Sequence, residues 1–483
     1  MDSYGCGCKN VIIIEGIFGE IYPDLSCYKG EDLKYNQESF ESLIEDSNEG
    51  FNELKPIIVK SYTMINNNRM EVTVITWGAS IVSLKCPDKF GHSTDVVLGF
   101  DDLKSYMNPV LNPFIGCVLG RCANRIRNGC FSIKDKDYEL TKNDNNHHLH
   151  GGANGFGRQI WNSHIDDCSV VMSYLSEDGE EGYPGAVLAT VRFKLTPDNK
   201  LEIHMRATTS KSTIINMSHG SLFNLAGHDA GEVELRKHKI LLNCDRWTFS
   251  DYSDSIPTGA IRGVGGTIMD LRIPRILGEY MEKVPPGEGF DHNFCVTKNW
   301  QSDSSFVARA LHMKSGRVLE VYSNQPGLQF YTGGRLLQQF TPSTFVTYDH
   351  CVHQQKLKTD EDINNYLSTN EENKENGEEL LTPDVKPLQF LTGKKGAHYK
   401  KNCAFSIQPQ NYPNAINYVC KCLYDDTIIY FTIMTNTFFI FIFIVMINIF
   451  FFQAHFPCAI LYPGQVYCHD LTYKFGIQLA NYM

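Results

Sequence analysis

Hydrophobic and polar residues alternate with a period of two along much of residues 56–335. The alternation is clearest over residues 70–74, 191–195 and 201–206, where every second side chain is apolar. A strand with one buried face requires this period, because successive side chains point to opposite sides of a sheet. The pattern therefore predicts a series of half-buried strands.

Turn-forming residues separate these stretches, for example Pro87-Asp88, Pro197-Asp198-Asn199 and Ser315-Gly316. No long amphipathic helical pattern interrupts them, and no fixed-period repeat of the kind found in propellers is present. Many strands joined by turns, with few helices, indicate an all-β fold. We expect a large antiparallel β-sandwich.

The chain divides unevenly around this sandwich. Residues 1–55 mix acidic and apolar stretches without clear periodicity, and we expect a partly ordered N-terminal arm. Residues 336–388 are predicted to be a disordered acidic insert, because residues 359–379 are rich in Asp, Glu and Asn and cannot bury enough apolar area to offset the ordering entropy. Strand-like patterns return over residues 389–418 and 454–483, which we expect to complete the sandwich.

Residues 427–452 are almost wholly apolar and long enough to cross a bilayer as a helix. A membrane span there would split the sandwich. The string Val419-Cys420-Lys421 can be encoded by GTATGTAAG, which resembles a donor splice site, and residues 449–453 can be encoded by a T-rich tract ending in CAG, which resembles an acceptor. We hypothesise that residues 419–453 are a retained intron or a gene-model error, with a membrane span or a buried helix as alternatives.

Composition narrows the class of function. The 483 residues carry a formal net charge of -11 and no long Lys/Arg run, which argues against a nucleic-acid partner. The 16 cysteines are scattered and form no paired CxxC set. We therefore predict no metal site, and this includes the neighbouring pair Cys6 and Cys8. The only early apolar run, residues 11–14, is too short for a secretory signal. These features favour a cytoplasmic protein with reduced cysteines.

A set of short strings resembles the galactose mutarotase (aldose 1-epimerase) family, in that family's order. They include GRCANRI at 120–126, LHGG at 149–152 and DGEEGYPG at 178–185, and the others lie at residues 75–79, 87–88, 97–100, 223–227, 290–294, 325–333, 410–415 and 462–464. The resemblance implies a β-sandwich that binds a sugar in a concave cleft. It also implies interconversion of the α and β anomers of aldoses such as galactose and glucose, no cofactor or metal, and a monomer.

Most sugar-binding positions of that family are present. The resemblance implies that the polar side chains which contact sugar hydroxyls are Asn124, Arg125, His150, Asp291 and Gln329. Each also has a plain structural interpretation: a turn with an ion pair, a buried structural histidine, a turn aspartate, or an outward-facing strand residue.

The two catalytic positions depart from the family. Ring opening removes the proton of the anomeric O1 hydroxyl and adds one to the ring oxygen, which takes a base and an acid on opposite sides of the sugar. Aligned without a gap, Gly220 occupies the position of the family's histidine acid, and Gln408 that of its glutamate base. His219 lies one residue earlier, and only a β-bulge would turn it to the same face.

Three hypotheses follow from these changes. The first is an active epimerase with a rearranged site, using His219 or His150 as the acid and a base such as Asp291. The second is a weakened or inactive relative that binds or senses sugar, and the changes at Gly220 and Gln408 favour it. The third is a membrane-tethered sugar-binding protein, which requires residues 427–452 to be expressed.

Overall fold

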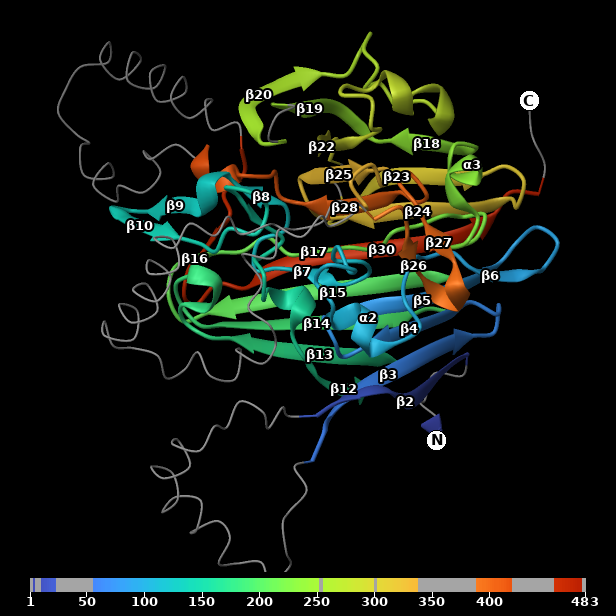
Figure 1. Cartoon of the computed structure of the whole chain (residues 1–483), viewed down its shortest axis with the longest axis horizontal. Helices are drawn as coiled ribbons and strands as arrows, with labels where there is room; N and C mark the ends of the chain where they lie inside the picture. Colours follow the sequence, from blue (N-terminus) through green and yellow to red (C-terminus); the bar gives the residue numbers. More distant parts are fainter. Residues whose placement is uncertain are drawn as a thin grey trace, which may run out of the picture.

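A computed structural model of the chain describes residues 3–4, 10–22, 55–251, 255–298, 302–337, 388–418 and 456–479. This part is built mainly of β-strands (Figure 1). Its α-helices, α2 (Leu103–Met107) and α3 (Gly231–Leu235), are single short turns. The predicted all-β fold is confirmed.

The largest sheet has nine strands in the order β12-β13-β14-β15-β30-β24-β23-β18-β21. The last strand of the chain runs through its middle, because Tyr473 pairs with Leu201 on one side and Val321 on the other (Figure 1). The strands are β12 (Asn162–Asp166), β13 (Ser169–Ser176), β14 (Val187–Leu195), β15 (Lys200–Thr209), β30 (Tyr467–Ile477), β24 (Arg317–Ser323), β23 (Ser305–His312), β18 (His238–Leu242) and β21 (Arg275–Ile276).

A second sheet has six strands in sequence order: β1 (Ser3–Tyr4), β2 (Val11–Ile21), β3 (Ile57–Asn66), β4 (Glu71–Ile75), β5 (Ser80–Pro87) and β6 (Ser93–Asp95). Strand β2 comes from the stretch predicted to be an arm, and it pairs with β3 from Val11↔Asn66 to Ile21↔Ile57. The sheet therefore begins well before residue 56. The strand shows no alternation in the sequence because residues 11–14 are all apolar. In the fold, Ile13 is buried and Ile12 is exposed.

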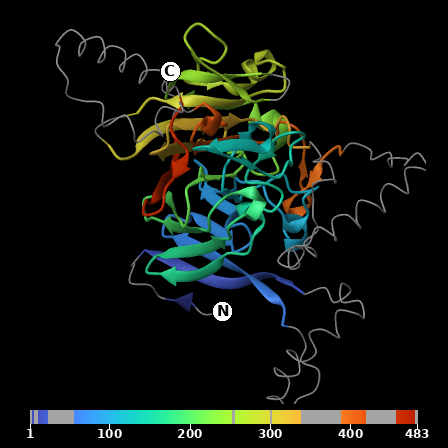
Figure 2. The same cartoon turned by 90° about the vertical axis from the view of Figure 1, so that its left-hand side faces the viewer.

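The third sheet has five strands in the order β20-β19-β22-β25-β28. Most of the predicted acidic insert, residues 338–387, lies outside the described residues, and strand β28 after it pairs with β25 before it. Both views place this sheet and the six-stranded sheet at opposite ends of the molecule (Figures 1 and 2). The strands are β20 (Pro257–Gly263), β19 (Cys244–Ser250), β22 (Asp291–Val296), β25 (Gly327–Tyr331) and β28 (Ser406–Gln410).

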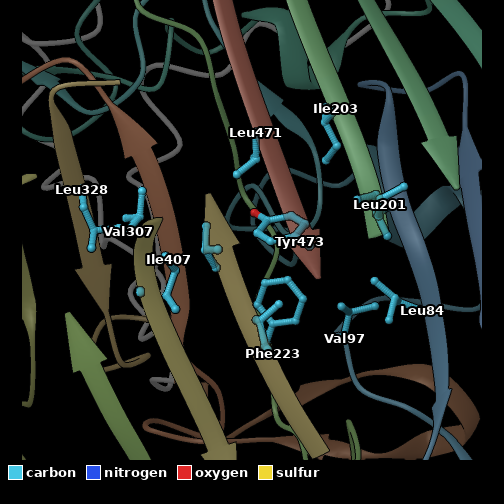
Figure 3. Close-up of a cluster of buried hydrophobic side chains, with 14 of the residues drawn as sticks. Leu84, Val97, Leu201, Ile203, Phe223, Val307, Leu328, Ile407, Leu471 and Tyr473 are labelled. Atoms are coloured by element: carbon cyan, nitrogen blue, oxygen red, sulfur yellow. The ribbon is translucent and has the colours of Figure 1, made fainter. Parts of the chain in front are cut away.

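One hydrophobic core joins the three sheets. The nine-stranded sheet contributes Leu201 and Tyr473, the six-stranded sheet Leu84, and the five-stranded sheet Leu328 (Figure 3). Phe223 lies among them, with its ring centroid 5.1 Å from that of Tyr473 in an edge-to-face contact. The alternation predicted over residues 70–74, 191–195 and 201–206 is confirmed, because the apolar members are buried.

Short two-stranded pairs carry the loops around the sheets. Two of these pairs position the candidate site: β7 (Val118–Leu119) with β17 (Ser218–His219), and β8 (Arg125–Ile126) with β11 (His148–Leu149). The others are β9 (Cys130–Ile133) with β10 (Lys136–Glu139), β16 (Thr213–Ile214) with β29 (Ile460–Leu461), and β26 (Leu391–Thr392) with β27 (His398–Tyr399).

The apolar segment at 427–452 and the whole suspected intron at 419–453 lie outside the described residues. The residues that flank this gap, Tyr418 and Phe456, lie against each other with ring centroids 4.8 Å apart. The chain therefore leaves the described fold and returns to it at one point. Within the described ranges, no helix is long and apolar enough to cross a membrane.

Candidate functional site

A cleft lies where the five-stranded sheet meets the loops that carry β7, β8, β11 and β17. All the residues singled out from the sequence except His219 line it: Asn124, Arg125, His150, Gly220, Asp291, Gln329 and Gln408. The fold thus brings together side chains that are far apart along the chain.

The register of three antiparallel strands sets the polar floor of the cleft. Gln329 on β25 lies directly opposite Asn293 on β22 and Gln408 on β28. Directly opposed residues point to the same face of a sheet, so these amides lie side by side. Gln329 Nε2 donates to Asp291 Oδ1 at 2.7 Å. Gln329 Oε1 is buried without a hydrogen-bond partner among the described residues, and an acceptor in that state suits a ligand hydroxyl.

Arg125 is the buried cation of the cleft. Its Nε donates to Asp144 Oδ2 at 2.6 Å, and its Nη1 lies 4.0 Å from Asp291 Oδ2. Burial alone would lower the pKa of Arg125, but the charges of Asp144 and Asp291 raise it above its usual value. Burial alone would likewise raise the pKa of Asp291, but Arg125 and Arg335 lower it. Arg125 and Asp291 are therefore both charged at neutral pH.

His150 is held as a neutral hydrogen-bond donor. Its Nδ1 accepts the backbone N–H of Asn124 at 3.1 Å, so the ring proton is assigned to Nε2. Burial, together with the charge of Arg125, lowers the pKa of His150 to about 3. The Phe114 ring packs against the imidazole with centroids 5.2 Å apart. At neutral pH, His150 can donate a hydrogen bond to a sugar oxygen, but it has no acidic proton to give.

His219 points away from the cleft into the core. Strand β17 pairs His219 with Val118, and the imidazole packs edge-to-face on Phe193 with centroids 6.1 Å apart. Its Nδ1 lies 3.0 Å from Ser221 Oγ, and burial lowers its pKa to about 3. No bulge turns the side chain round, so the one-residue offset from Gly220 puts it on the opposite face.

Gly220 lines the cleft, but it leaves little room for a side chain. A Cβ atom there would lie 2.6 Å from the carbonyl oxygen of Phe114. The backbone N–H of Gly220 donates to Cys117 O, and its own carbonyl accepts from Gly116 N. The loop before β7 is thus tied to Gly220 and occupies the space that a larger residue would need.

Gln408 offers an amide where a base would be needed. It is 8% exposed and lines the cleft opposite Gln329. A neutral amide can hold a hydroxyl, but it has no useful basicity. Among the described residues that line the cleft, the carboxylates are Asp144 and Asp291, and each is already engaged by a donor.

Some lining residues escaped the sequence analysis. Asp144 lies in the polar run 143–146, which reads as a turn, although its position six residues before His150 places it near the LHGG string. Arg335 lies at the predicted edge of the acidic insert, and its Nη2 donates to Ser255 Oγ at 2.6 Å. Tyr331 follows Gln329 by two residues on β25, so the alternation of that strand could have indicated it.

Among the residues that the structure describes, no three His, Cys, Asp or Glu side chains are grouped to hold an ion. The cleft instead presents amides, two carboxylates, two guanidinium groups and a neutral imidazole. Such a set suits an uncharged ligand with several hydroxyl groups.

Comparison with known proteins gives consistent matches. The family profile described as aldose 1-epimerase matches residues 60–421. Galactose mutarotases of pig and human are each 32% identical over 413 residues, covering 86% of this chain and 93% of theirs. The crystal structure of a GalM/aldose epimerase homologue from C. elegans aligns with a TM-score of 0.61 at 25% identity, covering 85% of this chain and 97% of that one.

Proposed function

Because this chain belongs to the aldose 1-epimerase family, we propose that its cleft binds an aldohexose such as galactose or glucose and interconverts the α and β anomers only weakly. The observation that carries the proposal is the contrast within one cleft. The polar side chains for sugar hydroxyls line it together, whereas the acid and base positions hold Gly220 and Gln408.

Sugar binding would use groups whose hydrogen-bonding state is already fixed. Arg125 and the Nε2–H of His150 supply donors, and Asp291 and the unpaired Oε1 of Gln329 supply acceptors. Pre-oriented groups lose little conformational freedom when a ligand binds. None of these four contacts involves Gly220 or Gln408, so binding can persist where the catalytic groups are lost.

Catalysis would lack its usual proton path. The base must take the O1 proton and the acid must protonate the ring oxygen, and each such group contributes roughly 10²–10⁴-fold. Gly220 has no side chain, and neutral His150 has no acidic proton. Asp291 is the remaining candidate base, but Arg125 and Gln329 stabilise its charged form and so weaken it.

The proposal is tested on the full chain by polarimetry of α-D-galactose and by calorimetry of galactose binding. We expect measurable binding with a rate slightly but reproducibly above the buffer blank. A rate far above the blank would contradict the weakened mechanism. A rate equal to the blank, with binding retained, would favour the alternative of a pure sugar binder or sensor. The alternative of a membrane-tethered sugar binder requires that residues 427–452 are expressed.

Arg125→Ala and His150→Ala are each expected to weaken galactose binding by roughly tenfold or more. Loss of a hydrogen bond from the charged Arg125 costs about 1.5–3 kcal/mol, and loss of the neutral His150 donor leaves a buried sugar oxygen unpaired at a cost of about 1–3 kcal/mol. Calorimetry measures the change. Matched controls are Arg192→Ala, whose side chain is 38% exposed and pairs with Asp166, and His164→Ala on the exposed face of β12. Unchanged binding in both cleft variants would remove the site assignment.

Gln408→Glu is expected to raise the mutarotation rate by roughly tenfold or more, because it returns a carboxylate to the base position while the acid stays absent. The two side chains are nearly isosteric, so galactose affinity should change little. The exposed Gln465→Glu serves as the control. Polarimetry showing the same rate for Gln408→Glu and Gln465→Glu would mean that the carboxylate at this position does not reach O1.

A further inference from the structure

Asp144 is a buried carboxylate in the cleft, and none of the sequence motifs predicted a role for it. Its side chain is 6% exposed and that of Arg125 is 8% exposed, so their ion pair is shielded from water. A buried pair of this kind is held far more firmly than a surface one, because neither charge can turn to solvent.

The loop that carries Asp144 is itself fixed. The backbone of Asp144 exchanges hydrogen bonds with that of His147, at 3.1 and 2.9 Å. The side-chain amide of Asn143 binds both the N–H and the carbonyl of Leu149, at 2.7 and 2.9 Å. The carboxylate thus lies on a fixed turn six residues before His150, in the wall of the cleft.

The ion pair engages the Nε side of the Arg125 guanidinium, and this fixes where the two Nη groups point. Asp144 accepts from Nε of Arg125, whereas Nη1 lies 4.0 Å from Asp291. A guanidinium is a planar fork, so fixing Nε also fixes the direction of both Nη groups. No hydrogen bond from either Nη reaches another described residue, so these donors stay free for a ligand.

We propose that Asp144 is a positioning residue, which anchors Arg125 through Nε and so aims its Nη donors at the sugar without touching the sugar itself. This inference rests on the proposed sugar-binding function. The competing interpretation is a purely structural ion pair, whose loss would loosen the cleft as a whole and not Arg125 in particular.

A double-mutant cycle separates the two interpretations. Galactose affinity is measured by calorimetry on the full chain for wild type, Asp144→Asn, Arg125→Lys and the double variant. Asp144→Asn keeps the shape and an acceptor oxygen but loses the charge, and we expect it to weaken binding about tenfold. Lysine has no Nε fork, so in the Arg125→Lys background the same change should have little further effect. Equal weakening in both backgrounds would overturn the proposal.

A second measurement covers the case in which Asp144→Asn does not fold. In wild type carrying ¹⁵N-labelled arginine, with Arg125→Lys used for assignment, the Arg125 Nε–H signal should stay protected and unshifted when galactose is added, while the Nη signals move. An Nε–H signal that shifts or exchanges on binding would overturn the proposal. Absence of galactose binding by wild type would instead identify the proposed function as the failing premise.

Discussion

The protein is expected to lose much of its folding stability as the pH falls from about 6.5 to about 5. The cause is a set of histidines that the sandwich buries in the neutral form. Burial is the main cause that lowers their pKa values, to about 3 for His150, His219 and His238, and to about 4 for His148, His292 and His469.

The direction follows from where the proton binds first. In the unfolded chain these histidines titrate near their usual pKa of about 6.5, so the unfolded state takes up protons before the folded state does. Their contribution to stability is therefore complete above about pH 6.5 and is lost as the pH falls toward their folded pKa values. Each can cost up to about 2 kcal/mol at pH 5, and several together rival a typical total of about 5–15 kcal/mol.

Denaturant unfolding followed by tryptophan fluorescence between pH 8 and pH 5 measures this loss. His219→Gln should reduce the number of protons taken up on unfolding near pH 5 by about one, because it removes one buried titrating group. His164→Gln, on the exposed face of β12, should leave the dependence unchanged. A free energy of unfolding that stays constant from pH 8 to pH 5 would contradict the prediction.

Gly220→His is expected to destabilise the fold and not to return a working acid. The new Cβ would lie 2.6 Å from the carbonyl oxygen of Phe114, and two backbone hydrogen bonds hold that loop against residue 220. The obstacle is backbone, so no side-chain rotation relieves it. Overpacking of this kind costs about 1–3 kcal/mol even for Gly220→Ala, and more for the larger residue.

Thermal and denaturant unfolding of Gly220→Ala tests this prediction most simply. The control is Gly476→Ala on β30, where a Cβ would meet nothing within 4 Å. If Gly220→Ala is as stable as wild type, the loop before β7 can move away from residue 220, and the prediction is wrong. Gly220→His combined with Gln408→Glu would then become a sensible way to rebuild catalysis.

The sequence predicted the strands well where one face alone is buried. Period-two alternation marked β14 and β15 because their outer faces meet water. The same rule missed β2, where Ile12 and Ile17 are exposed apolar residues that hide the alternation. Periodicity reports the polarity of side chains, and it fails wherever an outward position is apolar.

Only the cleft residues that lie in recognisable sequence motifs could be predicted. Arg125 and His150 lie in recognisable strings, whereas Asp144 lies in a polar turn whose partner is known only once β8 and β11 pair. The close approach of Phe114 to Gly220 is likewise a contact between backbone segments far apart in the sequence. Neither local propensity nor spacing carries that information.

The contact between Tyr418 and Phe456 has a consequence for how the gene can vary. Because the two rings meet, the two ends of the gap are held side by side, and the pairing of β28 and β30 with their neighbours does not require a particular length of chain between them. The entropy of closing such a loop grows slowly, by about 0.6 kcal/mol for each doubling of its length. Leaving out residues 419–453 would shorten this connection from 37 residues to two, which is about four doublings and lowers the closure cost by about 2–3 kcal/mol. A message without these codons would keep the codons for every described strand and shorten the connection between Tyr418 and Phe456.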